Sequence, residues 1–393
     1  MIAELFRHGA RWTLYDIFKE SDVQKNNGML SPTGMRQHYN LGKAVRKNYP
    51  QLFDQEYNHE QITMASTHVP RTVESAQSHL LGMYDMGTGF NLTTTSADFL
   101  NPPYAKSQSN IESNEELPFA LPQGYRPIPI FARAKDEDRT FMDVLPLVCP
   151  NAAKLVDQFK NDHFPLLDKA CLPISNALNA AGLSSIKMFN SPNFSVRQIE
   201  QIFDYMKAYF FKHGGHHPLM TPALYSQIEV AYSVSFFSNW GLPSIQKLWT
   251  HNMTSEILKA FNTKLQGKNP VTYMGLSGHD SNIAPFWNIL GVTTFACLVE
   301  ELQTGKKVEN CHKSIEYAAN IIWELGVVKG EDGNEMGLVR MVRDGEHMFG
   351  CEGGVAGGRG VVDGWCTVGE FEAAAEKLFM VGSDQEYKEL CGN

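Results

Sequence analysis

The sequence contains no pair of cysteines in the spacing C-x-x-C, although seven cysteines occur among its 393 residues. This absence argues against a zinc ribbon and against a thioredoxin-like redox motif, because both use that spacing. Seven cysteines fit either free thiols or three disulfides with one thiol left over, and we favour an oxidising compartment. The spacings of Cys297 with Cys311 and of Cys351 with Cys366 suit short disulfide loops, but the sequence alone leaves the pairing open.

An excess of basic residues is also missing. The chain has 34 lysines and arginines against 43 aspartates and glutamates, so its formal net charge is −9. A protein that binds nucleic acid through its overall electrostatic field should be basic. We therefore predict no nucleic-acid partner, although a basic pocket confined to a small part of this acidic protein is compatible with the composition.

Long apolar runs and a secretory signal are absent as well. The uncharged stretch 281–299 is long enough to cross a membrane, but it contains two asparagines, Pro285 and Gly291. We therefore expect a buried globular segment there and no transmembrane segment. The first residues lack the positively charged region followed by an apolar region that defines a signal peptide. The protein is then either cytosolic, or a leader precedes Met1.

The chain does contain the material for a large folded core. Hydrophobic residues make up 43% and charged residues 20% of the sequence, which excludes a disordered or collagen-like chain. Strand and helix patterns alternate over the first 130 residues, with buried strands predicted at 2–6 and 62–67. A helix is predicted to begin at residue 31, where serine precedes proline. Strand patterns return from residue 271 onward.

Between these two parts the patterns are helical. From about residue 136 helices dominate, as at 196–211, and no alternating strand pattern appears. The sequence therefore predicts an α/β fold with a mostly parallel central sheet, helices on both faces, and a smaller, mainly helical inserted domain. We assign residues 1–132 and 250–393 to the α/β core and residues 133–249 to the helical insertion, which forms a cap domain.

Charged and histidine side chains follow three of the predicted strands. The first strand leads into R-H-G-A-R at residues 7–11, another leads into S-G-H-D at residues 277–280, and a third leads to Arg71 at the start of a helix. Sites of parallel α/β sheets form beyond the carboxyl ends of the strands. We therefore expect three arginines, two histidines and one aspartate to meet. Three guanidinium groups suit a phosphoryl group, and a helix N-terminus adds backbone donors.

These residue types permit phosphoryl transfer without a metal ion. Guanidinium groups neutralise the phosphoryl oxygens, and a neutral imidazole attacks phosphorus to form a covalent phosphohistidine. Neighbouring guanidinium groups should lower the pKa of that histidine and keep it neutral in mild acid. A carboxylic acid such as Asp280 then protonates the departing alcohol oxygen and later activates the water that attacks the phosphohistidine.

These motifs resemble those of the histidine acid phosphatase family, the two-domain branch of the histidine phosphatase superfamily. The first family motif, R-H-G-x-R-x-P, corresponds to residues 7–13, where Thr13 replaces the proline. The His-Asp pair of the family corresponds to residues 279–280. Residues 66–76 are similar to the family segment that holds a third phosphate-binding arginine, although His68 stands where an aspartate is common. The resemblance covers most of the chain.

The resemblance implies an acid phosphatase that hydrolyses phosphate monoesters. Carried over residue by residue, it implies that His8 is the nucleophile and Asp280 the proton donor. The phosphate is then held by three arginines and one histidine, which are Arg7, Arg11, Arg71 and His279. Members of the family are largely metal-free, so we predict no metal and no cofactor.

The family also implies a cellular setting. Its members work in lysosomes, in secretions or at cell surfaces, so we expect a secreted or lysosomal protein whose leader precedes Met1. In that setting the seven cysteines favour three disulfides and one unpaired thiol. The expected partner is a small phosphorylated substrate, and a homodimer is an alternative to a monomer.

Two other functions remain as alternatives. A phytase or inositol-phosphate phosphatase of the same family should carry many additional lysines and arginines in the inserted domain, which has few. A catalytically silent binding protein on this fold typically lacks the nucleophile or an arginine, whereas all six residues are present here.

Two further patterns have plainer interpretations. The histidines at 213, 216 and 217 are too few to define a zinc site with its surrounding partners, and we interpret them as part of a solvated loop. The glycine-rich run 353–360 lacks the Lys and Ser/Thr of a P-loop, and we interpret it as a mobile surface loop.

Overall fold

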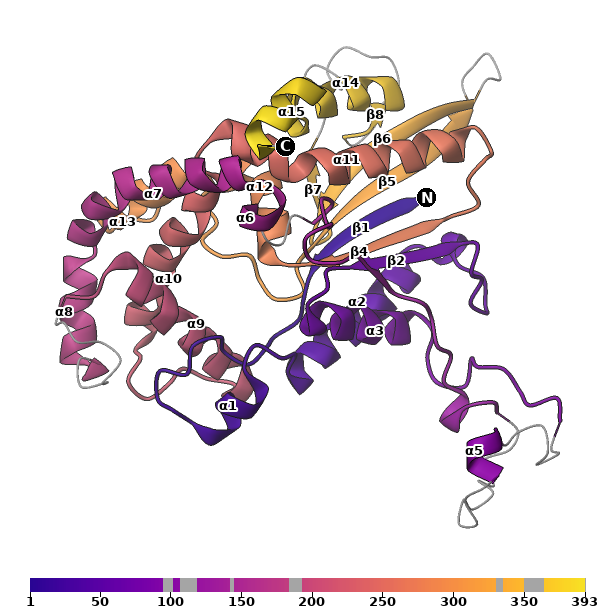
Figure 1. The fold of residues 1–393 in the computed structure, drawn as a ribbon, viewed down its shortest axis with the longest axis horizontal. Helices are drawn as coiled ribbons and strands as arrows, with labels where there is room; N and C mark the ends of the chain where they lie inside the picture. Colours follow the sequence, from indigo (N-terminus) through magenta and orange to yellow (C-terminus); the bar gives the residue numbers. More distant parts are fainter. Residues whose placement is uncertain are drawn as a thin grey trace.

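The computed structural model describes residues 1–94, 102–106, 119–141, 145–183, 193–329, 335–349 and 364–392 (Figure 1). Over these residues eight strands form one sheet in the order β3-β2-β4-β1-β5-β6-β7, with β8 paired to β6. The strands are β1 (Ile2–Arg7), β2 (Ile62–Ser66), β3 (Phe131–Ala132), β4 (Tyr273–Gly278), β5 (Asn320–Lys329), β6 (Glu335–Arg343), β7 (Glu346–Phe349) and β8 (Cys366–Thr367).

The sheet has a parallel half and an antiparallel half. The pairs β1–β4, β2–β4 and β2–β3 are parallel, as predicted. The pairs β1–β5, β5–β6, β6–β7 and β6–β8 are antiparallel. The α/β class is confirmed, but the sheet is mixed rather than mostly parallel. The physical reason for this correction is that a buried strand reads the same in either direction, so hydrophobic pattern does not report strand polarity.

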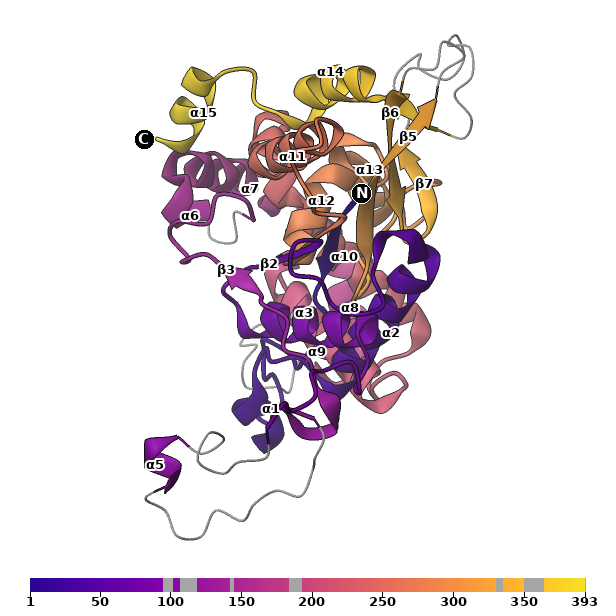
Figure 2. The ribbon, with the colours of Figure 1, turned by 90° about the vertical axis from the view of Figure 1, so that its right-hand side faces the viewer.

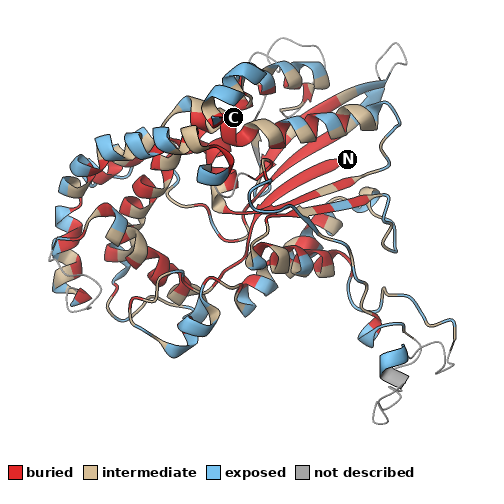
Figure 3. Ribbon diagram, in the orientation of Figure 1, coloured by how far each residue is buried: buried red, intermediate tan, exposed pale blue. Residues whose placement is uncertain are grey.

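Helices cover both faces of the sheet, as Figures 1 and 2 show. One face carries α2 (Pro32–Asn48) and α3 (Pro70–Met83), and the other carries α11 (Pro243–Leu265), α12 (Asp280–Ile289) and α14 (Val368–Phe379). Strand β1 is buried along its whole length, and Figure 3 shows the central strands as buried. Alternate residues of β1 belong to two separate hydrophobic clusters, one on each face of the sheet.

The chain between β3 and β4 is helical over its described residues. Its main helices are α6 (Leu145–Val148), α7 (Pro150–Ala170), α8 (Leu172–Ala180), α9 (Val196–His213), α10 (Pro222–Phe237) and α11. The later helix α13 (Phe295–Thr304) packs on α10. The assignment of residues 133–249 to a separate domain stays a prediction. Helix α11 continues without a break across residues 249 and 250.

Short elements complete the fold. They are α1 (Ser21–Asn26), η1 (Pro50–Leu52), α5 (Pro103–Lys106), η2 (Pro122–Gly124), η4 (Ser238–Trp240) and α15 (Asp384–Cys391). In the described part of the chain, no helix is both long enough and apolar enough to cross a membrane.

One disulfide closes a short loop and another connects distant parts of the chain. Cys297 and Cys311 are bonded, as their spacing predicted, and Cys149 at the start of α7 is bonded to Cys391 at the end of α15. Cys366 is disulfide-bonded as well, whereas Cys171 is a free, buried thiol. The predicted loop closed by residues 351 and 366 cannot be described in full, since residue 351 and the glycine-rich run 353–360 lie outside the described residues.

A buried polar network lies under β1 on the face covered by α2 and α3. The Glu4 carboxylate is fully buried and accepts hydrogen bonds from the Tyr273 hydroxyl and the Asn320 amide, each at 2.7 Å. Nε2 of His79 lies 3.5 Å from the same carboxylate. Burial raises the pKa of Glu4 to about 7, against the effect of its two hydrogen bonds. Glu4 is therefore protonated in acid and ionises close to neutrality.

Candidate active site

The end of β1 is held on both sides by neighbouring backbone. The His8 amide donates to the carbonyl of Gly278 at the end of β4, at 2.9 Å, and the His8 carbonyl accepts from the Ala318 amide at 3.2 Å. A Cβ at Gly9 would lie 2.4 Å from the carbonyl oxygen of Gly34 in α2. Only glycine fits such a close backbone approach, so the loop after β1 lies directly on the start of α2.

The end of β4 brings a second histidine beside the first. The rings of His8 and His279 meet edge to face, with centroids 5.3 Å apart. The His279 Nδ1 lies 3.3 Å from a guanidinium nitrogen of Arg71, which can only donate, so Nδ1 is the acceptor. The other ring nitrogen, Nε2, therefore carries the proton of the neutral ring and donates to the Thr67 hydroxyl at 3.1 Å. Three strand ends thus converge, as predicted.

Arg7, the last residue of β1, forms an ion pair with Asp280, which follows β4. Its Nη2 lies 2.7 Å from Oδ2 of Asp280, the first residue of α12. Its Nη1 donates to the carbonyl of Ile315, and the guanidinium lies over the Tyr317 ring, 4.3 Å from the ring centre. Arg7 is almost completely buried, so this network fixes its guanidinium plane.

Arg11 reaches an acidic partner that sequence reasoning missed. Its two terminal nitrogens donate to the Asp204 carboxylate of α9 at 2.5 and 3.4 Å. The same carboxylate accepts from the Thr13 hydroxyl at 2.7 Å and from the Leu14 amide at 2.8 Å. The threonine that departs from the family motif therefore supplies a hydrogen bond that proline cannot. Four donors on one carboxylate hold the loop against the helical part.

Burial, together with the surrounding arginine charges, keeps both histidine rings neutral. Burial is the largest cause that places the pKa of His8 well below its usual range, and the cations of Arg71 and Arg7 act in the same direction. The pKa of His279 is lowered in the same way, first by burial and then by the same two arginines. Arg11 contributes to both shifts, so all three arginine charges act on this pair of rings.

Arg11 and Asp204 shift each other in opposite directions. Burial lowers the pKa of Arg11, but the Asp204 carboxylate outweighs this and the net shift is upward. Burial raises the pKa of Asp204, but Arg11 and the hydrogen bonds it receives outweigh this and the net shift is downward. Both groups are therefore charged across the physiological range.

A lysine and a tyrosine complete the surroundings of the site. Lys207 of α9 is buried, with its Nζ 3.2 Å from the Ser314 hydroxyl and 3.4 Å from the Glu316 carboxylate. Burial and the nearby cation of Arg7 lower the pKa of Lys207. Its ammonium group lies 5.4 Å from the centre of the Tyr317 ring that also carries Arg7.

The missed residues did leave a signal in the sequence. Glu200, Asp204 and Lys207 are four and three residues apart on α9, so they share one face of the helix. The helix itself was predicted at 196–211, and buried apolar residues lie between these charged positions. Charged residues repeated on a face that must be buried indicate polar partners elsewhere in the fold. Asp204 pairs with Arg11, and Lys207 contacts Ser314 and Glu316. Glu200 accepts a hydrogen bond from the Ser235 hydroxyl at 2.6 Å.

The histidines at 213, 216 and 217 lie against aromatic rings. His213 lies on Tyr209 with ring centroids 4.1 Å apart, and His217 stacks on Phe18 at 5.0 Å. His216 lies 4.7 Å from Tyr225. Across the described residues, no group of three or more His, Cys, Asp or Glu side chains is arranged to hold a metal ion. His213 ends α9 and is exposed, and His216 and His217 lie half-buried in the loop that follows. The prediction of a loop is therefore confirmed, and aromatic packing is what this loop adds to it.

The six residues predicted from the sequence thus lie in one connected group. Arg7 contacts Asp280, His8 contacts His279, and Arg71 contacts His279. Arg11 acts on both histidines by charge while it is held by Asp204. A dense set of guanidinium donors beside a neutral imidazole suits a tetrahedral dianion such as a phosphoryl group.

A family model, described as "Histidine phosphatase superfamily (branch 2)", matches residues 15–342. The chain belongs to this family. The matched range of the histidine phosphatase model includes Arg71, His279 and Asp280 and begins after Arg11. The family assignment and the geometry of the first strand end are therefore independent observations.

Curated relatives match a short part of this histidine phosphatase. Human prostatic acid phosphatase is 39% identical over 84 residues, which are 20% of this chain and 22% of the relative. Lysosomal acid phosphatase of Xenopus laevis is 37% identical over 84 residues, 20% of this chain and 19% of the relative. The matched segment spans about a fifth of the length of these relatives.

Solved structures show the same fold over nearly the whole chain. A multiple inositol polyphosphate phosphatase of Bifidobacterium longum, in complex with inositol hexasulfate, aligns with a TM-score of 0.61 and 13% identity over 98% of this chain and 93% of that one. A phytase of Klebsiella sp. ASR1 aligns with a TM-score of 0.58 and 14% identity over 98% and 96%. At these identities the likeness shows the fold alone.

Proposed function

We propose that this histidine phosphatase is an acid phosphatase, a phosphoric monoester hydrolase that works through a phosphohistidine on His8. The observation that carries the proposal is the buried pair of neutral imidazoles, His8 and His279, among three guanidinium groups. Arg7, Arg11 and Arg71 bind the phosphate oxygens, and His279 donates a further hydrogen bond when its ring turns from Thr67 to the phosphate.

The tautomer of His8 is set by its own backbone. Its Nδ1 lies 2.8 Å from the carbonyl oxygen of Gly9, and a carbonyl oxygen only accepts. Nδ1 therefore carries the proton of the neutral ring, and the lone pair on Nε2 is available to attack phosphorus. The lowered pKa of His8 keeps this lone pair free below the pH at which an ordinary histidine becomes protonated.

Asp280 is the proposed proton donor. As the bond between Nε2 and phosphorus forms, the bond from phosphorus to the alcohol oxygen breaks, and Asp280 transfers its proton to that oxygen. Water then attacks the phosphohistidine, Asp280 accepts a proton from it, and inorganic phosphate leaves with His8 restored. Asp280 is ion-paired with Arg7. Phosphate and Asp280 therefore compete for the same guanidinium group, and phosphate binding to Arg7 releases Asp280. We expect the reaction to be fastest in acid, because the mechanism needs Asp280 to carry a proton.

The expected setting belongs to the same proposal. Disulfides join Cys149 to Cys391 and Cys297 to Cys311, and such bonds persist in oxidising compartments. Relatives are named lysosomal and prostatic acid phosphatases. We therefore propose a secreted or lysosomal protein with a small phosphorylated substrate. A homodimer stays a prediction. The inositol-phosphate alternative rests on the names of structures that share the fold.

The test is hydrolysis of p-nitrophenyl phosphate with EDTA present, comparing wild type, His8→Ala and His59→Ala. His59 is exposed and serves as the matched histidine control. We expect wild type and His59→Ala to be active and His8→Ala to lose at least about 10⁴-fold in kcat, as for other covalent nucleophiles. Rapid quenching should trap an acid-labile phosphoryl group on the wild type. Activity of His8→Ala, or loss of all activity with EDTA, would refute the mechanism.

A further inference from the structure

Tyr317 lies inside the site, and the proposed mechanism does not use it. It stands in the loop between α13 and β5, and only 6% of its side chain is exposed. The centre of its ring lies 5.9 Å from the centre of the His8 ring, and Cζ of Arg7 lies 4.3 Å from the same tyrosine ring centre. Tyr317 therefore contacts both the proposed nucleophile and an arginine that is proposed to bind phosphate.

The backbone around Tyr317 is attached to the end of β1. The amide of Ala318, the next residue, donates to the His8 carbonyl at 3.2 Å. On the other side of the tyrosine, the Ile315 carbonyl accepts from Nη1 of Arg7. Because these hydrogen bonds lie on both sides of Tyr317, its backbone holds a fixed position relative to Arg7 and His8.

The ring of Tyr317 is packed by its neighbours, whereas its hydroxyl has no partner in the protein. Phe211 meets the ring edge to face, with centroids 5.0 Å apart, and the Lys207 ammonium lies 5.4 Å from the ring centre. Within the described part of the chain no group forms a hydrogen bond with the Tyr317 hydroxyl, yet its oxygen is not closed off from solvent. Buried tyrosines usually find a hydrogen-bond partner. Water or a bound ligand must supply it here.

The Tyr317 hydroxyl lies among the charges that are proposed to hold phosphate. Burial raises the pKa of Tyr317, while the cations of Arg11 and Arg7 act in the opposite direction. Tyr317 in turn acts on Arg11, second among the charged groups after Asp204. Two phosphate-binding guanidinium groups therefore lie near this hydroxyl. Since the net shift of the tyrosine is upward, the hydroxyl keeps its proton and can donate a hydrogen bond.

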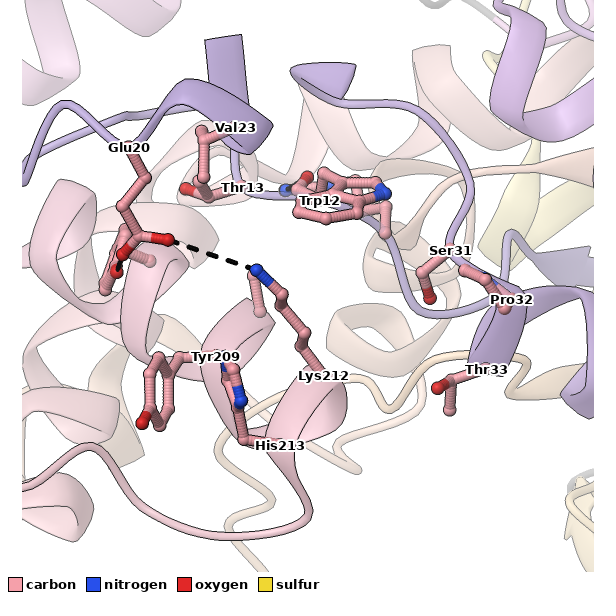
Figure 4. A pocket seen from close by; sticks show the side chains of 13 residues that line it. Trp12, Thr13, Glu20, Val23, Ser31, Pro32, Thr33, Tyr209, Lys212 and His213 are labelled. Carbon is pink, nitrogen blue, oxygen red and sulfur yellow. Dashed lines mark hydrogen bonds and ion pairs between the residues drawn. The ribbon is translucent and has the colours of Figure 1, made fainter. Parts of the chain in front are cut away.

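A cavity of about 250 Å³ also borders Arg11, between the loop after β1 and helix α9 (Figure 4). The described residues that line it include neither His8 nor Tyr317. Figure 4 shows Tyr209 and Lys212 on the α9 wall of this cavity. Tyr209 is therefore a second tyrosine that shares a cavity with Arg11 but lies outside the group around His8, and it provides a matched control for the hydroxyl of Tyr317.

We infer that Tyr317 is a further phosphate-binding residue, whose hydroxyl donates a hydrogen bond to a phosphate oxygen and whose ring holds the Arg7 guanidinium in place. This inference rests on the proposed phosphatase activity and adds a residue to its site. When phosphate displaces Asp280 from Nη2 of Arg7, the tyrosine ring and the Ile315 carbonyl remain in contact with the guanidinium. Arg7 therefore keeps its orientation towards the phosphate.

The first experiment removes the hydroxyl and keeps the ring. In Tyr317→Phe, the Kd for inorganic phosphate, measured by calorimetry, should rise about tenfold or more, because a hydrogen bond to a charged group is lost. For p-nitrophenyl phosphate kcat/KM should fall by a similar factor and kcat should change little, because the bond is made both before and during the reaction. Tyr209→Phe should keep the wild-type Kd and kcat/KM.

The second experiment removes the ring as well. In Tyr317→Leu, kcat for p-nitrophenyl phosphate should fall about tenfold below that of Tyr317→Phe, because Arg7 loses the ring that orients it. Tyr84→Leu is the matched control, since Arg46 lies over the buried Tyr84 ring at 4.4 Å at the end of α3. It should keep the wild-type kcat. Thermal unfolding of all variants separates a loss of folded protein from a loss of phosphate binding.

Phosphate binding and turnover separate the inference from the proposed function. If Tyr317→Phe binds phosphate as tightly as wild type, its hydroxyl does not contact phosphate and the inference is overturned. If Tyr317→Leu keeps the kcat of Tyr317→Phe, the ring does not orient Arg7. If wild type binds phosphate through Tyr317 but hydrolyses no ester, the binding role stands and the proposed phosphatase activity is wrong. A wild type that binds no phosphate would overturn both.

Discussion

Arg7 and His8 enter the site from β1, whereas Asp204 and Lys207 enter it from α9. The strand residues are fixed by ladder hydrogen bonds to β4 and β5 on both sides, so their positions are determined by buried backbone. The helix residues are fixed by side-chain contacts with Arg11, Ser314 and their neighbours. Strand ends therefore suit groups that react, where small displacements matter most. The helix supplies the carboxylate that balances the charge of Arg11.

The largest expected effect concerns the sheet side. Asp280→Ala should slow the hydrolysis of ethyl phosphate by about 10² to 10⁴-fold in kcat, because the ethoxide leaving group needs a proton. Hydrolysis of p-nitrophenyl phosphate should fall far less, since p-nitrophenolate leaves without one. The measurement is kcat for both esters in the variant and in wild type. Equal losses for the two esters would contradict the role of Asp280 as proton donor.

On the helix side, Asp204→Ala should reduce stability more than any other single change in α9. It leaves the buried Arg11 cation without its partner, and breaking a buried ion pair costs about 3 to 5 kcal/mol of unfolding free energy. Saturating inorganic phosphate should raise Tm more in this variant than in wild type, because the bound anion replaces the lost carboxylate. Thermal unfolding with and without phosphate measures both effects. An equal rise in Tm for both proteins would show that phosphate does not reach Arg11.

A third change tests the buried network behind β1. The pKa of Glu4 in the folded protein, about 7, lies above its ordinary value near 4.5, so the folded state binds this proton more tightly than the unfolded state. Its contribution is fully present below about pH 4.5 and is lost as pH rises to about 7, by at most about 3 kcal/mol. Denaturant unfolding from pH 4 to 8 should show this slope in wild type and lack it in Glu4→Gln.

His79 beside Glu4 acts in the opposite direction. Burial lowers its pKa well below the ordinary value, so its contribution is lost as pH falls below about 6.5. Glu4→Gln leaves this effect in place. The difference between the two unfolding curves therefore isolates Glu4, and a constant difference across the pH range would contradict its raised pKa.

The smallest expected effect lies in the loop that joins the two regions. Thr13→Val removes one hydrogen bond to the charged Asp204 carboxylate and should cost about 2 kcal/mol. Thr13→Ser keeps the hydroxyl and is the matched control. Denaturant unfolding of the three proteins measures the difference. If valine and serine variants are equally stable, the hydroxyl does not contribute to holding the loop on α9.

The site residues at the strand ends could be predicted from the sequence, whereas the site residues on α9 could not. Residues 7–11 and 279–280 follow short apolar runs that are typical of buried strands, and parallel strands bring their ends together. Asp204 lies 193 residues from Arg11, and no local pattern reports such a contact. The same reasoning separates the disulfides: a spacing of 14 residues suggested Cys297–Cys311, whereas the 242 residues between Cys149 and Cys391 gave no signal.

The antiparallel half of the sheet shows a second limit. Strands β5 and β6 follow apolar patterns near residues 320 and 338, and apolar pattern alone does not report their direction. The sequence between them, G-E-D-G-N at 330–334, contains an Asp-Gly pair, which is a hairpin signal that our prediction did not use. Thr13 shows a different limit, because the sequence revealed the unusual residue but not its role. Its departure from the family motif was visible in the sequence, and only the position of Asp204 explains it.

The bond between Cys149 and Cys391 also bears on how this protein responds to proteases. A single cut anywhere between these two positions produces an amino-terminal and a carboxyl-terminal fragment that remain covalently attached. Such a nicked protein migrates as one band on a non-reducing gel and as two after reduction. If the protein works outside the cell or in a degradative compartment, as proposed, a cut in a loop of its helical part leaves both fragments joined by this bond.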